Sequence, residues 1–336
     1  MKNINDNNYI YASTLVRAAD GVGTERERLD RALDCKSPQA LYDALREFGI
    51  AEESDAAQTS DTSVKTELLL NNALEKAVSL VKNSAPMSEI YDFLLYKYDC
   101  NNIKVAIKCS ILNTDGKNLY YSCGTVSPET VKKCVADRDF KALPFHMGEA
   151  ASEAVSAYEK TGEAREIDLS LDRACFADMA ESARDSGVDF FARYTEALAD
   201  SVNIRTAVRI SDSNLSNAAA AALMKRAAVP GGTVNTEIFL SDSGVFSASE
   251  IIGALPLSPI KSALTGADSY ASINAALNGF LANTVSKYSA KPFGAEVPAC
   301  FLINRAREIT YYRKLAALIS DGVTKKEVLK ERLGLS

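Results

Sequence analysis

Four polar residues could form a reactive centre if the fold brought them together. Asp99 and Asp200 are each followed, three residues later, by an asparagine, Asn102 or Asn203. Two carboxylates in one cleft can act as a general acid and a general base. Because Asp172 is a further acid that could join them, an all-α enzyme built on paired carboxylates is one hypothesis.

Other catalytic and ligand-binding chemistries have weaker support. His146 is the only histidine, so a histidine-based triad or metal site would depend on one residue, and its place after Leu143-Pro144-Phe145 favours a structural role at a helix corner. The glycine-rich stretches at 21–23 and 230–233 lack the pattern of a phosphate-binding loop. The seven cysteines contain no C-x-x-C pair. We therefore predict no catalytic site, no cofactor-binding site and no metal site.

The two Asp-Asn pairs lie in segments that repeat each other. Asp-x-x-Asn-Ile-Lys at 99–104 aligns with Asp-x-x-Asn-Ile-Arg at 200–205. A weaker copy contains Glu308 and Ile309, and residues 8–19 resemble the same helix, so the spacing is about 90–105 residues. Acids at matching places in separate repeats are expected to lie apart. We predict that each Asp is a helix N-cap contributing about 0.5–2 kcal/mol, and that each Asn bonds nearby backbone or a facing helix.

Shorter echoes follow the repeated helix in the same order. Gly-Thr-Val at 124–126 recurs at 232–234, and Ala-Leu-Pro at 142–144 recurs at 254–256. Three matches in register make an internally repeated architecture the simplest interpretation. The predicted domains are helical repeat 1 at 1–97, helical repeat 2 at 98–198, helical repeat 3 at 199–303, and a C-terminal motif helix with a cap at 304–336 that closes the array.

The hydrophobic pattern predicts an all-α fold. Apolar residues recur with helical spacing over Thr66–Val81 and Pro298–Ser320, and two further helices are predicted at 150–161 and 171–185. Ser37-Pro38 has the form of an N-cap followed by proline at the first helical position. The only strand candidates are NLYYS at 118–122 and TEIFL at 236–240, and both are short. The class expected from this pattern is all-α.

Composition and charge limit the compartment and the partners. The net charge of −6 argues against non-specific nucleic-acid binding, which needs a basic surface. The polar start MKNINDNNYI does not resemble a signal peptide, and the longest apolar run, around 218–224, is too short to span a bilayer. The scattered cysteines suit a reducing cytoplasm. We expect a soluble or peripheral protein.

One basic position recurs in all four copies of the helix. It could be a solvated side chain whose stem covers an apolar face, or part of a ring of positive charge that faces an acidic partner. The predicted partner-interface residues are Arg17, Lys108, Arg209 and Lys314, and the predicted structural caps are Asp99, Asn102, Asp200 and Asn203.

Several segments together resemble one family along nearly the whole chain. They include YKYDCNNIKVAIK at 96–108, DSVNIRTAVR at 200–209, and AREITYYRKLAAL at 306–318 followed by DGVTKKEVLKERL at 321–333. Further matches are NYIYASTLVRA at 8–18, LDRACFADM at 171–179 and PGGTV at 230–234. The chain resembles the C subunits of V/A-type ATPases, which are the counterparts of the d subunit in the vacuolar ATPase.

The resemblance implies a fold and a role. The fold would be three similar helical domains around a pseudo-threefold axis, which together form a funnel. The role would be non-catalytic and without a cofactor: a peripheral subunit on the cytoplasmic side, which links the central stalk to the membrane rotor ring and couples ATP turnover to proton or sodium transport. The alternative is a helical repeat scaffold for other soluble proteins, although the repeats are longer than the roughly 34–47 residues of common helical arrays.

Overall fold

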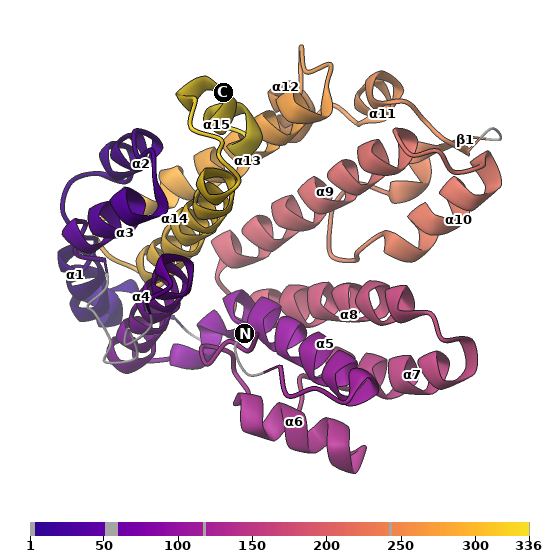
Figure 1. Ribbon diagram of the computed structural model, residues 1–336, viewed down its shortest axis with the longest axis horizontal. Helices are drawn as coiled ribbons and strands as arrows, with labels where there is room; N and C mark the ends of the chain where they lie inside the picture. The colour runs from indigo at the N-terminus through magenta and orange to yellow at the C-terminus, as the bar shows by residue number, and fades with distance from the viewer. Residues whose placement is uncertain (1–3, 51–59, 117–118, 242–243, 336) are drawn as a thin grey trace. The chain divides into compact units, whose positions relative to one another are not determined.

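The described part of the chain is all-α, as predicted. A computed structural model describes residues 4–50, 60–116, 119–241 and 244–335 (Figure 1). Within these ranges the only sheet pairs two short antiparallel strands, β1 (Leu240–Ser241) and β2 (Gly244–Val245). Of the two strand candidates, TEIFL forms the 3₁₀ helix η3 (Thr236–Phe239) before β1, whereas residues 119–122 form no strand and residue 118 lies outside the described residues. None of the helices described is both long enough and apolar enough to cross a membrane.

The chain forms two compact units, and one of them combines both ends of the sequence. We call Ile90–Ala282 the central unit, and Ile4–Glu89 with Asn283–Ser336 the terminal unit. This division into units does not test the repeat boundaries at 98, 199 and 304, which stay a prediction.

The first half of the central unit packs four helices around one core. They are α5 (Tyr96–Leu112), α6 (Pro128–Asp137), α7 (Phe145–Thr161) and α8 (Ala164–Asp185), and the 3₁₀ helix η2 (Ser88–Leu94) precedes them. Figure 1 shows α5, α7 and α8 side by side, in agreement with their contacts. The core between the helices is apolar and includes Ile103, Val131, Met147, Ile167 and Leu171.

The second half of the central unit has a core of its own. Its helices are α9 (Asp189–Ser211), α10 (Asn217–Ala227), α11 (Ala248–Ala254), α12 (Pro259–Ala263) and α13 (Tyr270–Ser289), the last of which continues into the terminal unit. The buried residues of this core include Ile204, Leu223, Phe239, Ile251 and Leu277. Each of the two cores thus starts from one copy of the repeated helix, α5 or α9.

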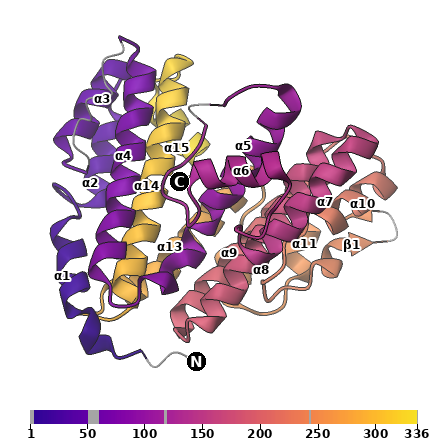
Figure 2. The same cartoon turned by 90° about the horizontal axis from the view of Figure 1, so that it is seen from below.

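The terminal unit is built around two long helices. It contains the 3₁₀ helix η1 (Asp6–Tyr9) and the helices α1 (Ile10–Ala18), α2 (Glu25–Leu33), α3 (Pro38–Glu47), α4 (Thr62–Ser84), α14 (Glu296–Ser320) and α15 (Lys326–Leu333). Figure 2 shows α4 and α14 running alongside each other, and α1 contacts both. The core includes Leu41, Leu45, Leu70, Val81 and Leu315, all of which are buried.

Local sequence signals explain several helix ends. The Ser37 hydroxyl accepts a hydrogen bond from the Ala40 N–H, which confirms the predicted N-cap of α3. The helices predicted at 150–161 and 171–185 are both longer at their N-terminal ends, since α7 begins at Phe145 and α8 at Ala164. Only Gly162 and Glu163 separate the two helices. This short connection is sufficient because Gly162, at a φ of +72°, adopts the left-handed conformation that ends α7.

Candidate functional site

Asp99 holds a loop that lies far along the chain from its own helix. It is fully buried within α5, and its carboxylate accepts hydrogen bonds from the Thr125 N–H at 3.0 Å, the Thr125 hydroxyl at 2.7 Å and the Val126 N–H at 3.1 Å. Burial raises the pKa of Asp99, while these three donors oppose the rise because they stabilise the charged form. The carboxylate therefore fixes the backbone of the loop just before α6 begins.

Asn102, one turn further along α5, holds the other end of the same loop. Its side-chain amide donates to the Tyr121 carbonyl at 2.7 Å, and its side-chain oxygen accepts from the Tyr121 N–H at 2.8 Å. The asparagine thus satisfies both backbone groups of one residue, as a strand partner would. Asp99 and Asn102 together fix the loop 121–126 at both ends.

The same arrangement recurs on α9. The Asp200 carboxylate accepts from the Thr233 hydroxyl at 2.7 Å and from the Val234 N–H at 2.9 Å. Asn203 donates to the Val229 carbonyl at 2.9 Å and accepts from the Val229 N–H at 2.8 Å. The repeated Gly-Thr-Val sequences are therefore the segments that the repeated Asp-Asn pairs hold, here within the loop 229–234.

A third loop is held by the matching positions of α14, with ionic side chains in place of Asp and Asn. Arg305 donates to the carbonyls of Ala19 and Asp20, at 3.3 and 2.9 Å. Glu308 accepts from Arg28 Nε at 2.6 Å and Nη2 at 3.1 Å, and Arg28 Nη1 donates to the Gly23 carbonyl at 2.7 Å. The loop 19–23 precedes α2 as the other two loops precede α6 and η3. We call 19–23, 121–126 and 229–234 the held loops, and α5, α9 and α14 the motif helices.

The prediction that Asp99 and Asp200 cap their own helices is wrong. Asp99 is the fourth residue of α5, whose N-cap is Leu95, and Asp200 lies in the middle of α9, whose N-cap is Val188. Neither side chain is free to bond the backbone of its own helix, because each is turned toward a loop about 25–35 residues further on. The two asparagines do bond backbone groups, one of the outcomes that the sequence left open.

The paired-acid hypothesis gains no support from this geometry. Asp99 and Asp200 are each engaged by the N–H and hydroxyl donors of their own loop, which is how structural carboxylates are satisfied. The third acid, Asp172, forms an ion pair with Lys104, with 2.6 Å between Asp172 Oδ1 and Lys104 Nζ. Each carboxylate therefore has a partner within the fold.

The recurring basic residues fall into two groups. Arg17 donates to the carbonyls of Lys291 and Pro292, and Lys108 pairs with Asp168 at 2.6 Å. Arg209 and Lys314 are exposed, and no hydrogen bond or ion pair to either is found among the residues that the structure describes. Of the four, these two cations are the ones available for a partner.

Each motif helix is also tied to a long helix of its own unit. On that helix, two polar side chains four residues apart bind one or two cationic side chains of the motif helix. The ties join Lys104 and Lys108 of α5 to Asp172 and Asp168 of α8, Arg205 of α9 to Asn274 and Asn278 of α13, and Arg313 of α14 to Glu67 and Asn71 of α4. The spacing of four puts both acceptors on one face of their helix.

The held loops lead to a first testable prediction. Replacing Asn203 with alanine should lower the free energy of unfolding by about 1–3 kcal/mol, because the Val229 N–H and carbonyl would stay buried without partners. The control is Asn101→Ala, which removes a half-buried asparagine that bonds only the Leu119 carbonyl among the described contacts and should cost less. Urea denaturation followed by circular dichroism measures both, and equal losses would contradict the prediction.

The architecture and these contacts together define a class of protein. It is an all-α chain in which repeated polar residues on long helices hold loops. The sequence matches the family described as the ATP synthase (C/AC39) subunit over residues 12–331, so the chain belongs to that family, which comprises the C and d subunits of V/A-type ATPases. It is also similar to the C subunit of the A-type ATP synthase from Desulfurococcus sp. (strain SY), with 25% identity over an alignment 336 positions long that covers 97% of this chain and 90% of that protein.

Proposed function

We propose that this chain is the non-catalytic coupling subunit of a rotary V/A-type ATPase, which links the central stalk to the membrane rotor ring. Membership of the family supports a place in such a complex. The observation that carries the coupling role is that the recurring polar positions of all three motif helices are used to hold loops and brace neighbouring helices. A protein that transmits torque needs elements that do not open locally, and satisfied buried polar groups oppose local opening.

In this proposal the chain works at the cytoplasmic side of the membrane as a peripheral subunit. Its partners are the central-stalk subunits and the rotor ring, and any contact with the membrane is through the ring. The proposal includes three helical repeats around a pseudo-threefold axis that form a funnel, as the resemblance implies. The C subunit from Desulfurococcus belongs to an ATP synthase, which agrees with a role in coupling ion transport to ATP turnover.

The test is affinity purification of the tagged full chain from detergent-solubilised membranes, followed by mass spectrometry. Recovery of rotor-ring and central-stalk subunits together is the expected result. Recovery of only soluble proteins, with no subunit of the ring or stalk, would overturn the proposal and favour the helical scaffold. Purification from membranes of cells that express the untagged chain provides the background.

The exposed cations Arg209 and Lys314 are the proposed contacts with an acidic partner surface. Replacing both with glutamate should weaken the recovered complex by about two- to tenfold, because an exposed ion pair is worth about 0.2–1 kcal/mol and reversal adds repulsion. The control is Lys133→Glu, an exposed cation on α6 outside the repeated position. Subunit ratios at two salt concentrations measure the effect, since screening should reduce it at high salt. A control that loses as much would contradict the assignment.

A further inference from the structure

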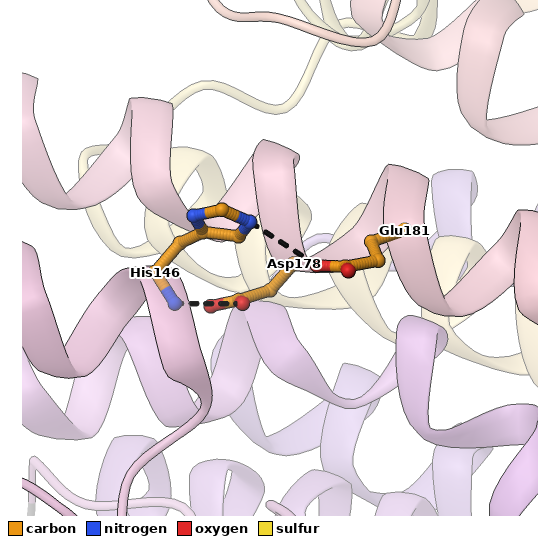
Figure 3. A group of neighbouring side chains, drawn as sticks. All are labelled: His146, Asp178 and Glu181. Carbon is orange, nitrogen blue, oxygen red and sulfur yellow. Dashed lines mark hydrogen bonds and ion pairs between the residues drawn. The ribbon is translucent and has the colours of Figure 1, made fainter.

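The only histidine of the chain lies beside two carboxylates. His146 is the second residue of α7, and Asp178 and Glu181 lie three residues apart on α8. One donor atom from each of the three residues lies within 4.8 Å of the others, and His146 Nε2 is 3.2 Å from Glu181 Oε2. Figure 3 shows the imidazole and both carboxylates gathered between the two helices. The imidazole distinguishes this group from an ordinary cluster of acids on a surface.

Asp178 is held rigidly in this group. Its two oxygens accept hydrogen bonds from the backbone N–H groups of His146 and Met147, both at 2.9 Å, and the residue is only 5% exposed. A carboxylate has about four acceptor positions, so these two bonds leave others available. Backbone donors of this kind are the outer shell that commonly orients the ligands of a metal ion. The side chain is thus both fixed and able to bind a cation.

Two like charges lie close together in this group, and the group is open to solvent. One oxygen of Asp178 and one of Glu181 lie within 4.8 Å of each other, so the two negative charges repel. The side chains of His146 and Glu181 are 36% and 57% exposed, which leaves a path for an ion that keeps some of its water. A bound cation would relieve the repulsion between the two acids.

We propose that His146, Asp178 and Glu181 bind one divalent transition-metal ion of the Zn²⁺ class, with water completing the coordination. One imidazole and two carboxylates suit Zn²⁺ and its neighbours, whereas Ca²⁺ and Mg²⁺ prefer oxygen ligands alone. The ion would join the N-terminus of α7 to α8. The partial positive charge of that helix end opposes the ion, so binding is expected to be weaker than in sites closed by four protein ligands.

The test is isothermal titration calorimetry of the chelator-treated full chain with Zn²⁺ at neutral pH. We expect saturable binding of one ion per chain. His146→Ala and Glu181→Gln should each weaken it at least about tenfold, since even outer-shell changes commonly cost 10–100-fold. Glu149→Gln is the matched control. It removes an exposed carboxylate from α7, the helix of His146, and should leave binding unchanged.

Two further measurements distinguish binding at His146 from binding elsewhere on the chain. Cys35→Ser removes the one cysteine that is not buried, so retention of binding in this variant excludes capture of Zn²⁺ by that thiol. The single histidine gives one set of imidazole proton signals in the nuclear magnetic resonance spectrum, and Zn²⁺ should shift them. Absence of saturable binding, equal binding by His146→Ala, or loss of binding in Cys35→Ser would each overturn the proposal.

Discussion

Replacing Glu308 with alanine is expected to lower the free energy of unfolding by about 3–5 kcal/mol, because two buried arginines would lose their shared carboxylate. Arg28 and Arg305 both pair with Glu308, and all three side chains are only 2–3% exposed. The Tyr312 hydroxyl also donates to Glu308 at 2.7 Å, and burial together with this carboxylate raises the pKa of Tyr312, so the tyrosine stays a donor. Urea denaturation at neutral pH, followed by circular dichroism, measures the loss.

The matched control removes another carboxylate that pairs with an arginine of α14. Glu25 accepts three hydrogen bonds from Arg307, but both side chains are about a quarter exposed. Glu25→Ala should therefore cost only about 0–1 kcal/mol, since water can replace the lost partner. If the two variants lose stability equally, burial does not decide the cost, and the importance assigned to Glu308 is wrong.

The sequence predicted which positions matter in the repeats better than it predicted what they bind. Asp99, Asn102, Asp200 and Asn203 could be found because identical residues recur at identical spacing. Their acceptor and donor groups lie in loops about 20–35 residues away, and helix-capping rules consider only neighbours in the chain. The repeated Gly-Thr-Val sequence was the signal that could have identified these loops. It follows the Asp-Asn motif at a similar distance in both copies, and two motifs that recur together can be contact partners.

The arginine network could not be predicted from one sequence. Arg28 and Glu308 are separated by 280 residues, and Arg28 belongs to no repeated motif. In the terminal unit the motif helix comes from the C-terminal part of the chain and its held loop from the N-terminal part. Linear alignment of the repeats therefore separates two segments that the fold brings together. It identified the copy around Glu308, but it also counted the N-terminal helix around Arg17 as a further copy.

The basic positions illustrate a different limit. Arg17, Lys108, Arg209 and Lys314 look equivalent in the alignment, but their surroundings in the fold differ. Lys108 faces the acid Asp168, so its charge is used within the fold, whereas Arg209 stays exposed. Which cation is free for a partner depends on a neighbouring helix that the repeat pattern does not identify.

Replacing Gly232 with alanine is expected to cost about 3 kcal/mol, because the new methyl group would displace a buried carboxylate. A Cβ at Gly232 would overlap Asp200 Oδ1 and lie 3.1 Å from Asp200 Cγ. The backbone there is not in the left-handed region, so the cost comes from the contact and from the hydrogen bonds to Thr233 and Val234 that the carboxylate would lose. Thermal and urea unfolding measure the change.

Gly253→Ala is a control with the opposite expected sign. Gly253 lies within α11, and a Cβ there would meet no atom within 4 Å, so alanine should stabilise the helix by about 0.5–1 kcal/mol. Gly124, which faces Asp99 as Gly232 faces Asp200, should behave like Gly232 when replaced by alanine. A loss at both repeated glycines and a gain at Gly253 would show that these glycines are required by the carboxylates they contact. A tolerated alanine at Gly232 would mean that the loop can move away, which would count against the rigidity that the proposed coupling role requires.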